Sequence, residues 1–272
     1  MLSTGQGATQ TGRISMAELD FLTFLIVCPL VGLAGFVDAI AGGGGFISLP
    51  AYLISGVPPI NAVATNKISS AMGTALATIR YGKMGYINAR TTAPAVALAL
   101  LGSWLGAELA MKLSDDVIRI AMIVLLPVMA VYVLRSKRLS GECGSEYPLK
   151  RTIIITMAIA FPTGIYDGFY GPGTGTILMT LLVGAAHYSL KNAAGTTKVI
   201  NLSTNAAALF TYLLSGKALL MLGLTAGLFN IAGAYLGTRF FSQKGAAVAK
   251  PVIIIVICIF FVKITGEMLG FF

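Results

Sequence analysis

Two aspartates of this chain each stand beside a glycine-rich stretch, within segments that are otherwise apolar enough to lie in lipid. Asp38 precedes the four glycines 42–45, and Asp167 precedes the run GPGTG at 171–175. A carboxylate is costly in hydrocarbon, and glycine permits sharp turns that expose backbone N–H groups. Because those groups must be satisfied inside a membrane, each stretch is predicted to be a helix break that binds a ligand. The alternative is a tight interfacial turn that the aspartate caps.

A lysine begins a polar stripe shortly after each break. At helical spacing, polar side chains recur on the same face as Lys67 in the first half and as Lys198 in the second. Such a stripe is costly against lipid, so it should face a partner or a water-filled path. The alternative is that hydroxyl and amide groups simply join helices. The stripe residues are Ser70, Thr74, Thr78 and Tyr81 after Lys67, and Asn201, Asn205 and Tyr212 after Lys198.

We expect both lysines to lie at helix N-termini, where the macrodipole and free N–H groups favour anions. An ammonium group there would complete a site for a small anion, with the two aspartates pairing with the lysines when the site is empty. The aspartates can also carry a coupled proton. The alternative is that the lysines snorkel to the membrane surface. The expected N-caps are Thr65 or Asn66 in the first half, and Thr196 or Thr197 in the second.

These patterns define the candidate substrate-binding or pathway residues. No catalytic, cofactor or metal site is predicted, because the phosphate-loop and HExxH motifs are absent and the single histidine, His187, cannot bind a metal alone. The chain is therefore not expected to be an enzyme. The candidate residues are Asp38, Gly43, Gly44, Asn66, Lys67, Ser70, Thr74, Asp167, Gly173, Thr197, Lys198, Asn201 and Asn205.

The composition is that of a polytopic membrane protein. Of 272 residues, 56% are hydrophobic and only 11% are charged, with a mean hydropathy of +0.85; soluble domains carry about 25% charged residues. The net charge of +9 does not indicate nucleic-acid binding, because the basic residues stand at the ends of apolar segments. The three cysteines are far apart, so we expect no disulfide framework.

Ten apolar segments follow one another along the chain, and eight of them approach the length of a membrane span. The other two, 46–56 and 176–187, are short. We expect a polar tail at 1–17 without a signal peptide, a first membrane repeat at 18–134, a central cytoplasmic loop at 135–150 and a second membrane repeat at 151–272. The segments are 18–41, 46–56, 66–82, 91–111, 117–134, 151–170, 176–187, 197–215, 218–240 and 250–271.

The two halves resemble each other at a nearly constant offset. Asp38 and Asp167 are 129 residues apart, and Lys67 and Lys198 are 131 apart. The predicted fold is therefore all-α, with two five-segment repeats comprising about eight full helices and two short ones. If every segment crosses the membrane, the second repeat is inverted and 13 of the 19 basic residues lie inside. If the short segments re-enter without crossing, 11 do, so the positive-inside rule favours inversion.

The motifs at these breaks resemble those of the TauE/SafE family. The resemblance rests on GFVDAIAGGGG at 35–45, GVPP at 56–59, AVATNK at 62–67, GIYDGFYGPGTG at 164–175 and TKVIN at 197–201. It extends over roughly residues 20–270. It implies a bacterial or archaeal cytoplasmic-membrane transporter of about eight helices, associated with export of sulfite, sulfoacetate and related organosulfur anions.

The expected function is that of a secondary transporter, an exporter of small anions bound between the two Asp–Gly breaks. The expected partners are the anionic substrate, the lipid bilayer and protons as the coupling ion, with no nucleic acid; a homo-oligomer is left open. Two other classes stay open at this point, a passive anion channel with the same polar lining and a membrane assembly factor that transports nothing.

Overall fold

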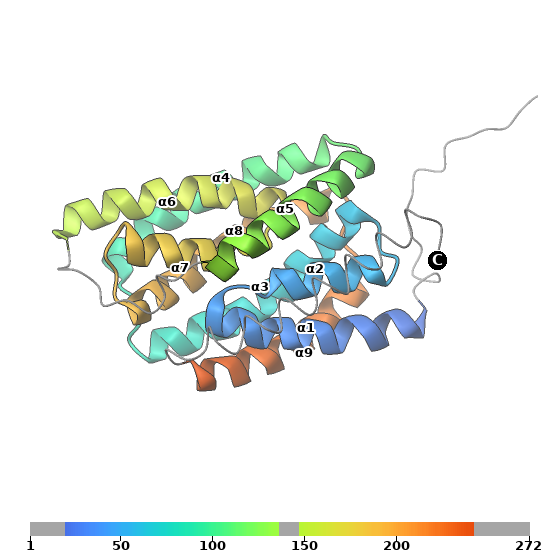
Figure 1. Ribbon diagram of the computed structural model, residues 1–272, viewed down its shortest axis with the longest axis horizontal. Helices are drawn as coiled ribbons and strands as arrows, with labels where there is room; N and C mark the ends of the chain where they lie inside the picture. Colours follow the sequence, from blue (N-terminus) through green and yellow to red (C-terminus); the bar gives the residue numbers. More distant parts are fainter. Residues whose placement is uncertain (1–19, 136–146, 242–272) are drawn as a thin grey trace, which may run out of the picture.

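The computed structural model describes residues 20–135 and 147–241. That part of the chain forms nine α-helices and contains no strand (Figure 1). The predicted tail 1–17, most of the central loop 135–150 and the last segment, 250–271, lie outside the described residues. The helices are α1 (Phe21–Ala41), α2 (Gly45–Ile54), α3 (Pro59–Lys83), α4 (Ala89–Met111), α5 (Asp115–Arg135), α6 (Leu149–Phe169), α7 (Thr174–Gly184), α8 (Leu190–Leu214) and α9 (Leu220–Phe240).

Two pairs of helices pack closely along seams of glycine. Helix α1 lies along α9, with a Cβ built on Gly233 overlapping the carbonyl oxygen of Gly32. Helix α4 lies along α6 in the same way, with a Cβ on Gly106 overlapping the carbonyl oxygen of Ile165. In both pairs, residues further along one helix contact residues further along the other. The two helices of each pair therefore run in the same direction. Without side chains at these points, the two backbones can approach closely.

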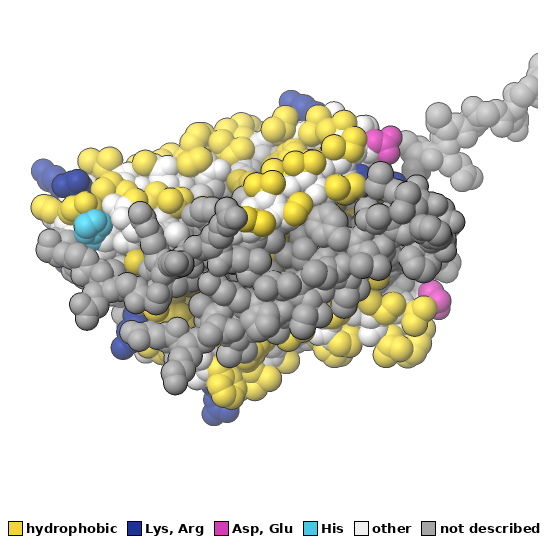
Figure 2. Space-filling model, in the orientation of Figure 1, with side chains coloured by type: hydrophobic (Ala, Val, Ile, Leu, Met, Phe, Trp, Pro, Cys, Tyr) yellow, Lys and Arg dark blue, Asp and Glu magenta, His cyan; other side chains and the backbone are white. Residues whose placement is uncertain are grey.

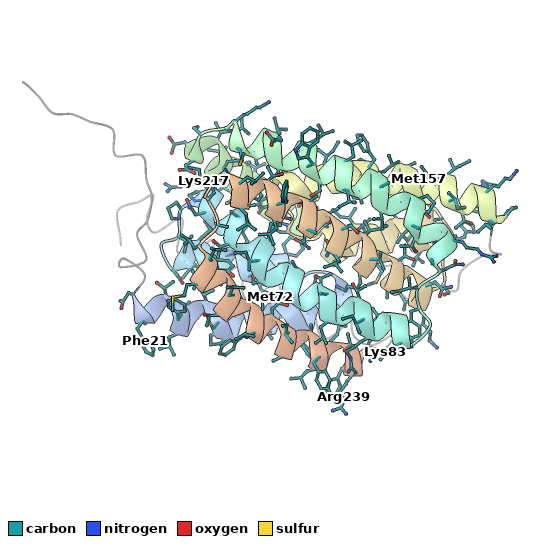
Figure 3. The ribbon with its side chains drawn as sticks, turned by 180° about the vertical axis from the view of Figure 1, so that it is seen from behind. Phe21, Met72, Lys83, Met157, Lys217 and Arg239 are labelled. Atoms are coloured by element: carbon teal, nitrogen blue, oxygen red, sulfur yellow. The ribbon has the colours of Figure 1, made fainter. Side chains whose placement is uncertain are left out.

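The halves of the chain begin at opposite ends of the molecule. Phe21, at the start of α1, lies at the same end as Lys217, whereas Lys83 and Arg239 lie at the other end (Figure 3). Helix α4 follows α3 after a short turn at the Lys83 end, and α6 runs parallel to α4. Helix α6 therefore starts at the end opposite to the start of α1.

Each of the short helices α2 and α7 follows a break at a predicted position. Helix α1 ends at Gly42, which has a φ of 74° and is the left-handed C-cap that glycine adopts without strain. Helix α7 begins after Gly173, whose φ is 84°. Each short helix then returns toward the end from which the preceding long helix started, and α3 and α8 cross the molecule again (Figure 1).

Helices α3 and α8 each begin seven residues before the predicted segments 66–82 and 197–215, and this changes the position of the lysines. Pro59 occupies the first turn of α3, where its missing N–H is not needed. The hydroxyl of Ser189 accepts a hydrogen bond from the N–H of Asn192 at 3.2 Å and so caps α8. The predicted apolar segments miss these starts because polar residues interrupt the apolar run, at Asn61 and Thr65 in α3 and at Lys191 and Asn192 in α8.

The prediction that the lysines lie at helix N-termini is therefore wrong. Lys67 and Lys198 are each the ninth residue of their helix, about 12 Å from its start at 1.5 Å per residue. The expected N-caps are also wrong, because all four residues lie inside the helices. These are Thr65, Asn66, Thr196 and Thr197.

Four of the described helices, α1, α4, α6 and α9, are long and apolar enough to cross a membrane. Helices α3 and α8 have 25 residues each, but their polar stripes lower their hydropathy. Large apolar side chains are exposed along the outer helices, such as Trp104, Ile154 and Leu228. On the face seen in Figure 2, hydrophobic side chains cover the flanks and charged ones lie toward the helix ends. This is the surface of a multi-pass membrane protein.

Candidate functional site

The two glycine-rich breaks meet inside the helix bundle. A Cβ on Gly42 would overlap the backbone at Gly175, and a Cβ on Gly45 would lie 2.7 Å from the Cα of Pro172. Close backbone approach of this kind is possible only because these positions lack side chains. The hydroxyl of Thr176 also donates a hydrogen bond to the carbonyl oxygen of Ala41 at 2.6 Å. The breaks are therefore two sides of one site.

Each lysine forms an ion pair with the aspartate of the other half. Lys67 Nζ lies 2.9 Å from Asp167 Oδ2, and Lys198 Nζ lies 2.6 Å from Asp38 Oδ2. Both ammonium groups also donate to the backbone carbonyl oxygen of the same aspartate. The lysine side chains are only 2% and 0% exposed. The two ion pairs therefore join the halves of the chain at their interior.

Two tyrosines hold the neighbouring carbonyl groups from within each half. The Tyr81 hydroxyl donates to the carbonyl oxygen of Ala39 at 2.6 Å. The Tyr212 hydroxyl donates to the carbonyl oxygen of Gly168 at 2.9 Å. Near the C-terminal end of α1 and of α6, the carbonyl oxygen of the aspartate thus accepts a hydrogen bond from the lysine of the other half. The next carbonyl oxygen accepts one from the tyrosine of its own half. The carbonyl oxygen of Asp38 also accepts the N–H of Gly42 at 2.9 Å, so the lysine and tyrosine bonds add to the backbone capping of this helix end.

The helix ends at the breaks create a strong local field. The C-terminal ends of α1 and α6 carry partial negative charge, which favours the lysine ammonium groups placed there. The N-termini of α2 and α7 carry partial positive charge at the same breaks. The anion-attracting helix ends are therefore those of the short helices, and not those of α3 and α8 as the sequence suggested.

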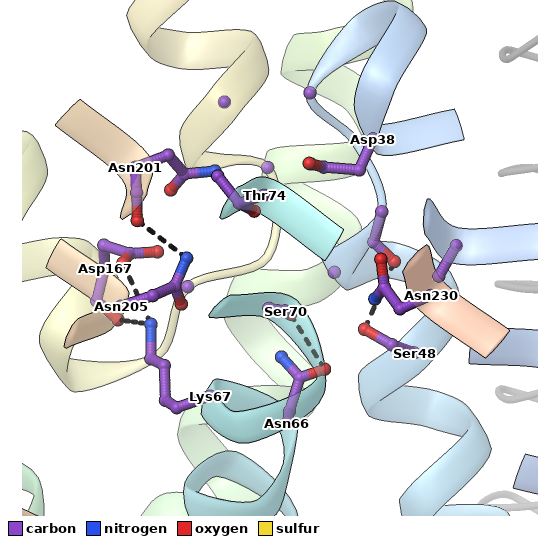
Figure 4. A pocket seen from close by; sticks show the side chains of 17 residues that line it. Asp38, Ser48, Asn66, Lys67, Ser70, Thr74, Asp167, Asn201, Asn205 and Asn230 are labelled. Carbon is purple, nitrogen blue, oxygen red and sulfur yellow. Dashed lines mark hydrogen bonds and ion pairs between the residues drawn. The ribbon is translucent and has the colours of Figure 1, made fainter. Parts of the chain in front are cut away.

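A small cavity of ≈ 30 Å³ lies between the breaks (Figure 4). Space of about 10–15 Å³ on this measure holds one water, so the cavity has room for a few atoms. Ten of the thirteen predicted site residues line it, and Gly43, Thr197 and Lys198 do not. The predicted residues that line it are Asp38, Gly44, Asn66, Lys67, Ser70, Thr74, Asp167, Gly173, Asn201 and Asn205.

Hydrogen bonds order part of the polar lining. The Ser70 hydroxyl lies 3.4 Å from Asn66 Oδ1, and Asn205 Nδ2 donates to the carbonyl oxygen of Asn201 at 2.7 Å. Two buried oxygens have no hydrogen-bond partner within the described part of the chain, namely Asn201 Oδ1 and Thr197 Oγ1. Because a buried polar atom without a partner is costly, water or a ligand is needed beside them.

Sequence reasoning missed Asn230 and Ser48. Asn230 is only 5% exposed and lines the cavity from α9, opposite the Lys67–Asp167 pair (Figure 4). Its amide occupies the space that side chains at Gly35 and Gly73 would fill. Asn230 is an amide within an otherwise apolar segment, and that signal was present in the sequence. The Ser48 hydroxyl donates to the carbonyl oxygen of Gly44, so it belongs to the first turn of α2.

His187 lies at a different cavity, of ≈ 190 Å³. Its ring stacks on Tyr147 with 4.1 Å between ring centroids, and the guanidinium carbon of Arg151 lies 3.8 Å from the centroid of the same Tyr147 ring. No group of three histidine, cysteine or acidic residues that could hold a metal occurs within residues 20–135 and 147–241.

The long apolar helices define the class of protein, a multi-pass membrane protein, and sequence comparisons indicate a membrane transporter. The chain is 35% identical over 243 residues to "Probable membrane transporter protein ORF9" of Sinorhizobium sp., covering 89% of this chain and 92% of the relative. It is 31% identical over 240 residues to "Probable membrane transporter protein YfcA" of Escherichia coli K12, covering 88% of each. A "Probable membrane transporter protein" of Haemophilus influenzae is 32% identical over 238 residues, covering 87% of this chain and 91% of the relative.

Residues 27–264 match the family described as "Sulfite exporter TauE/SafE". The chain belongs to the TauE/SafE family, as its motifs indicated, and the family and these relatives indicate a membrane transporter. No solved structure matches it significantly.

Proposed function

We propose that this protein is a secondary transporter that exports small anions of the sulfur oxyanion or sulfonate class across the cytoplasmic membrane. The observation that carries the proposal is the cavity between the two breaks, where Lys67 meets amide and hydroxyl groups from α3, α8 and α9. Amides, hydroxyls and an ammonium group provide hydrogen-bond donors for oxyanions. The N-termini of α2 and α7 add partial positive charge.

We further propose that the two halves form an inverted repeat. Corresponding long helices have matching lengths, 21 residues for α1 and α6 and 25 for α3 and α8. The parallel pair α1–α9 corresponds to α6–α4, and the ion pairs are reciprocal. Inverted repeats that bind substrate at broken helices are a common transporter design. The end that carries Lys83 and Arg239 would face the cytoplasm by the positive-inside rule.

A carrier fits the site better than an open channel. The cavity is only ≈ 30 Å³, and the buried ion pairs join both halves across it. An open pore would need a continuous water-filled path. An anion that reaches Lys67 must instead compete with Asp167, which is how a binding site can be coupled to a change of conformation.

Flux measurements in proteoliposomes test the proposal. Vesicles loaded with sulfite, sulfate, thiosulfate or a simple sulfonate should show protein-dependent flux, which Lys67→Ala or Lys198→Ala abolishes while the protein still inserts. Lys83→Ala is the matched control, because this lysine is exposed at the end of α3. Normal flux in the Lys67→Ala/Lys198→Ala double variant would overturn the anion site. Accumulation against a gradient distinguishes a carrier from a channel.

A further inference from the structure

The ionisable groups of the central site add up to zero net charge. Lys67 and Asp167 form one pair, and Lys198 and Asp38 form the other. Around Asp167, the titratable groups on neighbouring elements are Lys67 of α3, Tyr212 of α8 and Tyr166 of its own helix. Tyrosine hydroxyls are uncharged near neutral pH, so they do not alter this balance.

The two ion pairs are not equally accessible from the cavity. Both members of the Lys67–Asp167 pair line it, whereas Lys198 is fully buried behind Asp38 and does not. An anion that enters can therefore reach the ammonium group of Lys67 but not that of Lys198. Binding at Lys67 withdraws the cation from Asp167, whose side chain is 4% exposed. An unpaired carboxylate at such a position is strongly unfavourable and becomes neutral instead.

We infer that binding of one monoanion at Lys67 is accompanied by uptake of one proton on the carboxylate of Asp167, so that anion and proton move together. This inference rests on the proposed function. The anion takes the place of the Asp167 carboxylate at the ammonium group, and the proton comes from solvent to an oxygen of Asp167. The site then again has zero net charge.

The proposal commits to a proton because the group that loses its partner is the Asp167 carboxylate, with a side chain only 4% exposed, and a proton bound to that carboxylate neutralises it directly. The coupling also assigns different roles to the two aspartates: Asp167 is the proton acceptor, while Asp38 stays paired with Lys198.

Calorimetry of the purified full chain tests this inference. Methanesulfonate is the probe, because it stays a monoanion across the accessible pH range. Its heat of binding is measured in two buffers that lack sulfonate groups and differ in ionisation enthalpy, which gives the number of protons taken up per anion. The expected number is about one, and it should not change when choline replaces sodium.

Two variants with matched chemistry identify the acceptor. Asp167→Asn should bind methanesulfonate with no proton uptake and with an affinity that no longer depends on pH. Asp38→Asn, the same change at the corresponding aspartate, should still take up one proton per bound anion. Uptake that persists in Asp167→Asn, or that disappears only in Asp38→Asn, overturns the assignment.

The unaltered protein gives an independent test if Asp167→Asn does not fold. Coupling to one proton weakens methanesulfonate binding tenfold for each unit of increasing pH. An affinity that is constant with pH, a heat that is the same in both buffers, or binding that requires sodium would overturn proton coupling and leave the proposed function standing. If neither methanesulfonate nor any of the sulfur oxyanions binds, the proposed function fails as well.

Discussion

Replacing Lys67 with methionine tests how much the buried ion pair contributes to stability. The pair joins Lys67 Nζ and Asp167 Oδ2 at 2.9 Å, with side chains 2% and 4% exposed. At an effective dielectric constant of 20, two unit charges at this distance attract by about 6 kcal/mol, before desolvation is subtracted. Removing one partner of such a pair typically costs about 3–5 kcal/mol, because the other charge stays buried. We expect Lys67→Met to lower the free energy of unfolding by this amount.

The double variant Lys67→Met/Asp167→Leu separates the ion pair from the rest of the site. It removes both charges and leaves only the backbone carbonyl of residue 167 without its lysine donor, a loss of about 1–3 kcal/mol. The double variant should therefore be more stable than Lys67→Met alone.

The assay is reversible unfolding in mixed micelles, completed as a double-mutant cycle. Lys83→Met, at an exposed position, serves as the control and should change stability by no more than about 0.5 kcal/mol. If Lys67→Met costs less than about 1 kcal/mol, as for a surface pair, or if the two changes are additive, the pair is not a buried coupled one.

Three further predictions concern packing, binding and hydrogen bonding. Gly233→Ala should destabilise the protein by about 1–3 kcal/mol, because its Cβ overlaps the backbone of α1; Gly82→Ala, whose Cβ would meet only the Ile87 side chain at an ordinary contact distance of 3.6 Å, should be neutral or stabilising in the same unfolding assay. Asn230→Ala should weaken anion binding in a thermal-shift titration without loss of folding, and an unchanged affinity would remove Asn230 from the site. Tyr81→Phe and Tyr212→Phe should each lower the free energy of unfolding by about 1 kcal/mol, since each loses one buried hydrogen bond. An unchanged stability of either variant in the same unfolding assay would contradict this.

The sequence predicted the breaks and most of the lining, because both depend on local chemistry. A glycine run beside an aspartate predicts a helix break, and polar residues at helical spacing predict a polar helix face. Neither prediction requires knowledge of the tertiary packing. Hydropathy did not give the starts of α3 and α8, since polar residues such as Asn61 and Lys191 interrupt the apolar run near each start, and Pro59 and the cap at Ser189 fix these starts instead. The lysines were consequently placed two turns too close to the helix ends.

The sequence also could not predict which aspartate each lysine pairs with. The chain contains two lysines and two aspartates at matching positions, and pairing within a half is as consistent with the spacing as pairing between halves. Only the packing of α1 and α6 against the opposite lysine helices decides it. Asn230 was missed because it has no counterpart: the corresponding position of the first half is Ala99.

The reciprocal ion pairs also set an order of events during biosynthesis. Lys67 is made 100 residues before Asp167, and Asp38 is made 160 residues before Lys198. At about 5–20 residues per second, the first half waits for several seconds to tens of seconds with both charges unpaired.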